Sequence, residues 1–437
     1  MATTAEGIAD YSAGFEKIIQ PFIQDNIPNQ TKLLKVLKTN DNVQIFNNNF
    51  YVTLRSARSG GVQTVPNDKA QLVTGGASFT QGTISPTYQA AVFDISDVVI
   101  KASQSKAQAI QPFLQVESAA LVKDFSKNIN RQYYSDGVGI IGMTSESGGS
   151  VSGSALQIQY PDANASNSDG RATPFYGTAA GGVNGDILPW VKYFAPGNII
   201  GIGSAGTSIG TIAANGVAGV GIANGTATLG TLTLTGNTSG GIPGSAPIYI
   251  MDFAGDAAGT SEINGFRGAL SEGTANYMGL SRSTLTWQPQ YMGTAQSQAL
   301  SIPNMEQMFW TASEYANDGD KYVWFMNKSL ISKFADILIA LRRQVNTIEL
   351  VSGWGGLEFN AGKGPVAVMA DYDCPDGEAV LVNLDTWTVC EIAPMGFLMN
   401  NPQRRPDYLT FQSVFSWYTN LACRAPAANG RMVRQTK

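Results

Sequence analysis

The chain has 437 residues, of which 43% are hydrophobic and only 14% are charged, and its formal net charge is −5. This acidic balance argues against a general nucleic-acid binder, and the absence of histidine excludes Ser-His-Asp and Cys-His catalysis and histidine-ligated zinc. The length suffices for two or three domains. Soluble proteins usually carry about 25% charged residues. A charged content this low indicates a surface that is largely covered by other subunits.

Cysteine usage and the N-terminal sequence indicate the compartment. The three cysteines, Cys374, Cys390 and Cys423, form neither a disulfide framework nor a CxxC metal motif, so we expect buried free thiols. The N-terminal stretch lacks a basic region followed by an apolar one, and no run approaches ~18 apolar residues. We expect no signal peptide, no membrane-spanning helix and synthesis in the cytosol.

Residues 1–45 carry two short apolar stripes, which Pro21 and Pro28 interrupt. The second stripe consists of Leu33, Leu34, Val36 and Leu37. Such a broken pattern favours an N-terminal arm that lies over a partner. The alternative is an ordinary pair of short helices packed on its own domain.

Residues 46–100 predict a long β-hairpin. Strand patterns around Phe50 and from Phe79 flank a tip, about 56–76, that is rich in turn residues. A loop of about 20 residues without a core of its own is usually functional or mobile. Lys69 lies in this tip, where it is either a reactive amine or, by default, a solvated one.

The segment from Pro112 to Tyr134 predicts one uninterrupted helix, with Pro112 in the first turn. Its apolar face consists of Leu114, Ser118, Leu121, Phe125 and Ile129, which recur at helical spacing. The sequence Ser135-Asp136-Gly137 provides the stop signal.

The same helix carries a basic stripe, Lys123, Lys127 and Arg131, at four-residue intervals. Side chains so spaced share one helix face. They form either a solvated face with ion pairs inside the helix or a contact with a neighbouring subunit or packaged nucleic acid.

Residues 138–260 are rich in glycine, alanine, serine, threonine and asparagine. From Ile199 to Ile250, short β runs punctuated by glycine predict a small antiparallel β element. The run GIGSAG lacks the GxGxxG pattern and lies in no βαβ unit, so it does not indicate nucleotide binding.

The last third of the chain mixes helices and strands. Helices are expected over 303–317 and 330–341, and the run from Tyr322 predicts a buried strand that further strands follow. This order is α+β rather than alternating βαβ.

Two polar clusters could carry chemistry. The run DYDCPDGE contains Asp371, Asp373, Asp376 and Glu378, which suit either a turn between strands or oxygen ligation of a hard cation. The spacing misses the EF-hand loop, so we favour the turn. Arg404 and Arg405 either clamp carboxylates of a neighbour or lie in a solvated loop. We expect no catalytic residue, no metal and no cofactor.

The order of these segments resembles the major capsid proteins of tailed bacteriophages, which have the Hong Kong 97-like fold. The resemblance covers nearly the whole chain, and its motifs are soft. They are FDISDVVIKASQ, INRQYYSDGVG, GFRGALSEGTANYMGLSRST, YVWFMNKSLISKF, ELVSGWGGLEFNAGKGPVAVMADYDCPDG, VLVNLDTWTV and SVFSWYTNLACRAP. The resemblance implies an α+β fold with an N-terminal arm, an extended β-hairpin loop, a long spine helix, peripheral and axial domains, and a Gly-rich β insertion.

The same resemblance places the domain boundaries. They are 1–45 for the arm, 46–100 for the extended loop, 101–147 for the spine helix and peripheral domain, 148–260 for the Gly-rich insertion, 261–317 for the peripheral domain, 318–400 for the axial domain and 401–437 for the C-terminal return to the peripheral domain.

The implied function is structural and not enzymatic. Subunits would self-assemble into pentamers and hexamers of an icosahedral shell enclosing double-stranded DNA. Implied partners are other copies, a separate scaffolding protein, a portal protein, optionally a decoration protein, and DNA bound without sequence specificity, but no membrane. The chain would be made in the host bacterial cytoplasm and reside in the virion. Candidate inter-subunit contacts are Lys69, Lys123, Lys127, Arg131, Arg404 and Arg405.

The chain departs from the type member of the family in two respects. Nothing at the N-terminus resembles a cleavable scaffolding domain, so we expect no maturation cleavage. No partner asparagine is evident for Lys69, so we expect no covalent cross-linking. The alternatives are an encapsulin-like compartment shell, a secreted β-rich adhesin or carbohydrate-binding protein, and a carboxylate hydrolase.

Overall fold

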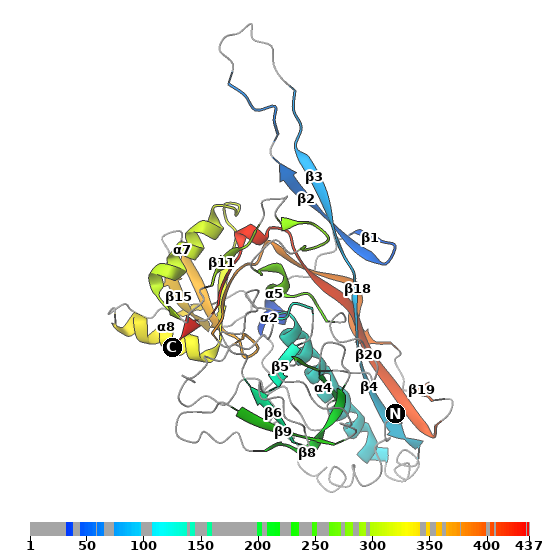
Figure 1. Ribbon diagram of the computed structural model, residues 1–437. Coiled ribbons are helices and arrows are strands. Elements are labelled where there is room, and N and C mark those ends of the chain that lie inside the picture. Colours follow the sequence, from blue (N-terminus) through cyan, green and yellow to red (C-terminus); the bar gives the residue numbers. More distant parts are fainter. Residues whose placement is uncertain are drawn as a thin grey trace.

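A computed structural model gives the architecture of the chain (Figure 1). The residues it describes are 32–37, 44–57, 59–64, 74–97, 107–137, 140–144, 155–159, 199–202, 208–218, 229–235, 247–250, 262–271, 276–282, 288–293, 298–340, 347–349, 355–360, 364–375, 377–398, 403–405, 408–433 and 435–436.

The longest helix is α4, Ala107–Gln132, which confirms the predicted helix. Its 26 residues at ~1.5 Å per residue span roughly 39 Å. It begins before Pro112, not at it, because Ala107 to Ala109 include good helix formers that extend the helix by a turn. After the helix the chain turns at Gly137, whose φ of 84° suits glycine. No helix in the described part of the chain is long and apolar enough to cross a membrane.

A short helix, α2 (Lys32–Val36), packs on α4. Leu33 and Leu37 are buried in the main core, and the Leu34 N–H donates to Asn130 Oδ1 over 3.3 Å. This part of the expected arm therefore packs on its own chain, as the alternative interpretation held. The arm residues 1–31 lie outside the described residues.

The hairpin is built from β1 (Gln44–Phe46), β2 (Asn49–Ala57) and β3 (Ser78–Ile84), all antiparallel. Asn47 and Asn48 have φ of 48° and 61°, as a two-residue type I′ turn between β1 and β2 requires. The hairpin projects away from the rest of the chain (Figure 1).

The expected hairpin over 46–100 is too long. Its pairing ends at Ile84, and the following strand, β4 (Thr87–Ser96), pairs over its whole length with β20 (Thr410–Cys423). The break falls at Ser85-Pro86, where proline supplies no N–H for a continuous ladder.

β20 is the centre of a long sheet. On its other side it pairs with β18 (Trp387–Phe397) and β19 (Gln403–Arg404). One face of this sheet packs on α4, where the Phe125 and Phe415 rings meet edge to face at 5.0 Å. The boundary expected at residue 400 is therefore displaced, since β18 belongs to this sheet.

The second large sheet has seven strands in the order β11-β21-β17-β13-β16-β15-β14. Their bounds are Gln290–Met292, Gly430–Met432, Ala379–Asn383, Tyr322–Met326, Pro365–Ala370, Gly355–Asn360 and Thr347–Glu349. The small elements nearby are η3 (Pro426–Ala428), β12 (Gln298–Ala299) and β22 (Gln435–Thr436). Within the segment 401–437, β20 lies in the long sheet, β21 joins the seven-stranded sheet, and β22 pairs with β12.

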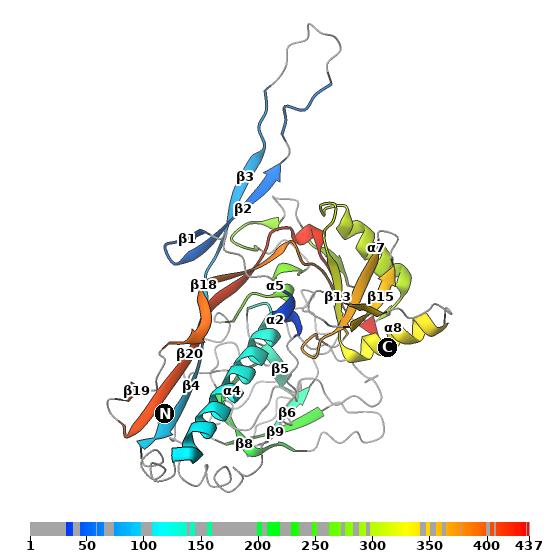
Figure 2. The ribbon, with the colours of Figure 1, turned by 180° about the vertical axis from the view of Figure 1, so that it is seen from behind.

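Both faces of the seven-stranded sheet are covered, which explains the continuous apolar run of β13. Val323 and Phe325 face the core shared with α4, whereas Trp324 and Met326 face helices α7 (Ile302–Ser313) and α8 (Lys328–Ala340). Both helices were predicted from their periodicity, and Figure 2 shows them beside β13 and β15. Tyr315, inside the helix expected over 303–317, lies beyond the end of α7 and is exposed.

The Gly-rich region forms a closed barrel in the order β10-β5-β6-β9-β8-β7. The bounds of β5 to β10 are Ile140–Thr144, Ala155–Gln159, Ile199–Ile202, Ser208–Ala218, Leu229–Thr235 and Pro247–Ile250. All its pairings are antiparallel, which confirms the predicted β element. The barrel lies at the end of the molecule opposite the hairpin (Figure 1).

Candidate assembly surfaces

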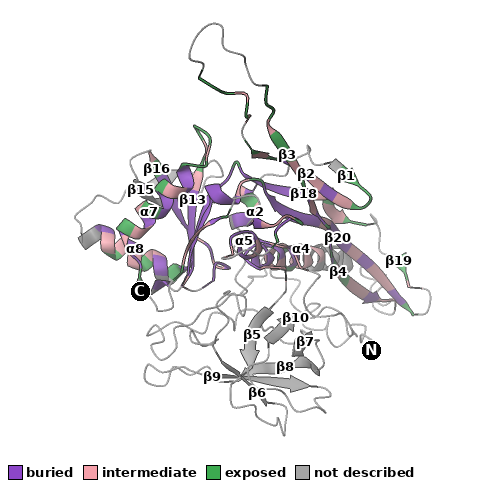
Figure 3. Ribbon diagram, turned by 45° about the horizontal axis from the view of Figure 1, so that its top comes forward, coloured by how far each residue is buried: buried purple, intermediate pink, exposed green. Residues whose placement is uncertain are grey.

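The hairpin is anchored at its root and exposed toward its tip (Figure 3). Phe50, Val52 and Ile84 at the root are buried in the main core. Farther out, Phe79 is 67% exposed and Val62 is 88% exposed. Large apolar side chains held in water on a projecting element are typical of a surface that another chain covers.

Exposed apolar side chains also occur beside the hairpin root. Phe46 at the β1–β2 turn is 73% exposed. On the long sheet, the side chains of Tyr88 and Val92 point away from α4 and are exposed, and the Tyr88 ring packs edge to face on Tyr418 at 5.4 Å. Six of the thirteen exposed large hydrophobic residues in the described part of the chain lie on the hairpin and β4: Ile45, Phe46, Val62, Phe79, Tyr88 and Val92.

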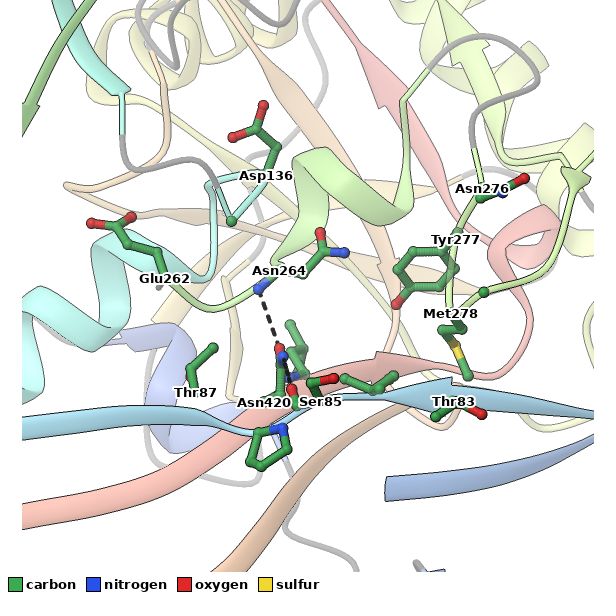
Figure 4. Close-up of a pocket in the computed structure, with 15 residues that line it drawn as sticks. Thr83, Ser85, Thr87, Asp136, Glu262, Asn264, Asn276, Tyr277, Met278 and Asn420 are labelled. Carbon is green, nitrogen blue, oxygen red and sulfur yellow. Dashed lines mark hydrogen bonds between the residues drawn. The ribbon is translucent and has the colours of Figure 1, made fainter. Parts of the chain in front are cut away.

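A polar crevice of about 400 Å³ lies between the hairpin root and the body. Asn420 of β20 spans one wall: its Nδ2 donates to the Ser85 carbonyl over 2.8 Å, and its Oδ1 accepts from the N–H groups of Asn264 and Leu421 (Figure 4). On the other side, the Thr83 N–H donates to the Met278 carbonyl over 3.0 Å. These contacts fix the direction in which the hairpin leaves the body, and no sequence pattern indicated them.

Replacing Asn420 with alanine should lower the free energy of unfolding by about 1–3 kcal/mol, because the buried Leu421 N–H and the partly buried Asn264 N–H lose their acceptor. Urea unfolding followed by circular dichroism measures the loss. The matched control is Asn276→Ala, an exposed position lining the same crevice, where a change within about 0.5 kcal/mol is expected. Equal losses for the two variants would contradict the anchoring role of Asn420.

The basic stripe of α4 does not form one exposed face. Lys123 is exposed, Lys127 is half-buried with its Nζ 4.5 Å from the centre of the Tyr372 ring, and Arg131 is buried in an ion pair with Glu262. Burial lowers the pKa of Lys127, although the carboxylates of Asp373, Asp124 and Asp371 oppose that shift. Lys127 and Arg131 therefore make contacts within their own chain.

The remaining expected contact residues differ in their surroundings. Arg404 is exposed, whereas Arg405 forms a 3.2 Å ion pair with Asp94 and stacks on Tyr408 at 4.5 Å. Lys69 lies outside the described residues.

The acidic run 371–378 forms a turn between β16 and β17, as favoured from the sequence. Asp371 and Asp373 are buried beside Asn130 of α4, and Glu378 is buried in an ion pair with Arg431. Burial, with the neighbouring Asp373 carboxylate as a second cause, raises the pKa of Asp371 to about 6. Across the described residues, no group of three side chains of metal-ligating type comes together. Asp376 lies outside the described residues.

Comparisons with known proteins give matches among solved structures. No family model matches the chain, and no curated protein matches it. Solved structures that are similar include a Cyanophage A-1(L) capsid, at 14% identity, with 95% of this chain and 96% of that chain covered and a TM-score of 0.48. The chain is similar to tailed-phage capsids.

Two further structures extend the comparison. The capsid of a native GTA particle is 10% identical over 99% of this chain and 100% of that one, with a TM-score of 0.42. The SrpI encapsulin complex of Synechococcus elongatus is 12% identical over 33% of this chain and 53% of that one, with a TM-score of 0.27. At these identities we infer function from the geometry of the chain itself.

Proposed function

We propose that this chain is the building block of a closed protein shell, assembling with copies of itself into pentamers and hexamers around double-stranded DNA. The observation that carries the proposal is the hairpin, which projects from the body and exposes Phe79 and Val62. The outer part of the hairpin, residues 55–57, 59–64 and 74–81, contains no buried residue in the single chain. It is suited to lie on a neighbouring subunit.

The energetics favour association through this surface. Burying apolar area contributes about 25 cal/mol per Å², and each copy both gives a hairpin and receives one. Ordering of side chains and loss of subunit freedom offset part of that gain. A ring of copies repeats the same contact at every interface. A modest free energy of association per contact therefore adds up over the ring and favours its closure.

The family architecture suggests roles for the other parts. Helix α4 would be the spine helix, the long sheet around β20 the peripheral domain, and the seven-stranded sheet with α7 and α8 the axial domain. The barrel would be the inserted β subdomain on the outer surface. Lys69, Lys123 and Arg404 remain proposed contact residues, and a separate scaffolding protein, a portal protein and optionally a decoration protein remain proposed partners.

The test is expression of the chain alone and with its neighbouring scaffold gene, followed by negative-stain electron microscopy. Closed shells, or rings of five and six, are expected. A monodisperse monomer in the presence of the scaffold would contradict the proposal. Shells that carry protein cargo and never nucleic acid would favour the encapsulin-like alternative.

A further inference from the structure

Two carboxylates are buried together where three parts of the chain meet. Asp371 and Asp373 follow β16, and both side chains are buried. Asn130 of α4 bridges them, because its Nδ2 donates to Asp371 Oδ1 over 3.3 Å and to Asp373 Oδ2 over 2.6 Å. The Oδ1 of the same asparagine accepts the Leu34 N–H of α2. One side-chain cluster thus joins α2, α4 and the seven-stranded sheet.

The cluster carries more negative than positive charge. The groups that act on Asp371 are Asp373, Tyr134 and Asn130, and Cys374 lies near Tyr134. Among the described residues, the half-buried Lys127 of α4 is a cation that interacts with Asp371 and Asp373, and Asp124 lies near it. Two buried carboxylates facing one partly solvated ammonium are unfavourable when both are ionised.

The hydrogen bonds also leave a place for a proton. Asp371 Oδ1 accepts from the Asp373 N–H over 2.9 Å and from Asn130. Asp371 Oδ2 is buried, and the group closest to it in the described part of the chain is the Tyr134 hydroxyl. The bonds from the Asp373 N–H, Tyr134 and Asn130 lower the pKa of Asp371, but burial and the Asp373 carboxylate raise it by more. Oδ2 is the natural site for protonation, because a carboxylic acid removes the unbalanced charge.

We propose that the Asp371 carboxyl group, buried beside the Asp373 carboxylate, holds a proton in mildly acidic solution, and that losing this proton near neutral pH weakens the packing of helix α4 against the seven-stranded sheet. This packing is thus a pH-sensitive element of the fold, and it does not depend on what the chain assembles into.

The direction of the effect follows from linkage. Burial raises the pKa of Asp371 from 3.8 to about 6 in the folded chain. The folded state therefore binds the proton more tightly than the unfolded state does. The stability that this proton contributes is fully present below the pKa of the unfolded state and is lost as the pH rises through the pKa of the folded state. The packing of α4 against the seven-stranded sheet is expected to be more stable at about pH 5 than at about pH 8.

The variant Asp371→Asn tests the proposal, because the amide has the shape of the protonated acid and carries no charge. Thermal unfolding of the full chain is followed between about pH 4 and pH 8. The midpoint of D371N is expected to exceed that of the wild type by a few degrees at the alkaline end, and the difference should disappear toward the acidic end. Asp318→Asn, in an exposed turn, is the matched control and should show a constant difference.

Hydrogen exchange gives a local measurement on the same proteins. After correction for intrinsic rates, peptides covering 127–134 and 371–374 should exchange several-fold faster above the transition than below it in the wild type, but not in D371N. Parallel stability profiles for the wild type and D371N would overturn the proposal.

If D371N does not fold, Asp373→Asn serves as the second variant. Removing the neighbouring charge should move the exchange transition of the two peptides to lower pH. A wild-type chain whose exchange in these peptides shows no transition over the same range would overturn the proposal without any variant.

Discussion

Replacing Phe79 with aspartate is expected to abolish shell assembly and leave the subunit folded. Phe79 lies on β3 opposite Arg55 of β2 and is 67% exposed in the single chain. A carboxylate is well solvated there, so folding loses little. If the position is covered in the assembly, the charge must be desolvated at every repeat of the contact, and an isolated buried carboxylate costs far more than a neutral polar group.

Sedimentation velocity and negative-stain imaging of F79D measure this loss, and thermal unfolding shows that the subunit is intact. Phe79→Leu is the matched control, because it keeps an apolar side chain at the same position and should still assemble. Normal shells from F79D would show that the outer part of the hairpin is not buried between subunits. Failure of F79L as well as F79D, with both subunits folded, would indicate that the contact needs the aromatic ring.

Helices and buried strands followed from short-range patterns in the sequence. The apolar spacing of Phe125 and Ile129 predicted the buried face of α4, and both residues are in the core. The unbroken apolar run of β13 predicted a buried strand, and the helices expected over 303–317 and 330–341 are present as α7 and α8. Periodicity depends on local geometry and burial, which is why these elements could be predicted from the sequence.

The pairing of strands that are far apart in the chain could not be predicted from the sequence. β4 continues the hairpin in sequence, yet it pairs with β20 more than 300 positions later, and no local pattern specifies that partner. The same holds for polar networks: Arg131 was expected on an exposed stripe, but its partner Glu262 lies on a remote segment. A buried ion pair depends on tertiary packing, so the spacing of charges along a helix cannot show whether a basic residue is exposed or pairs with a remote carboxylate.

The hairpin was predicted from the sequence, but the contacts that anchor it were not. The turn-rich stretch between Phe50 and Phe79 indicated a projecting hairpin, and the hairpin is present. What anchors it, Asn420 and the Met278 carbonyl, comes from two other parts of the chain. Asparagine in a strand-like run carries no sequence signal of such a role, since its partners are backbone groups.

Replacing Glu378 with glutamine is expected to cost about 3–5 kcal/mol of unfolding free energy, the largest single-residue loss we predict. Arg431 donates to the two Glu378 oxygens, from Nη2 over 2.6 Å and from Nε over 3.0 Å, and both side chains are buried. The pair lies beside the edge where β17 meets β21 and fastens the end of the chain to the seven-stranded sheet. Without the carboxylate, the guanidinium remains buried with its charge uncompensated.

Urea unfolding monitored by tryptophan fluorescence measures this loss, and a double variant separates charge from packing. In Glu378→Leu with Arg431→Met, both charges are removed together, so most of the loss should be recovered, because apolar side chains of similar volume often replace a buried pair at little cost. If the double variant is as unstable as E378Q, packing and not the ion pair holds β21 in place. A loss below about 1 kcal/mol for E378Q would mean that water reaches the pair, since solvent-exposed pairs contribute no more than that.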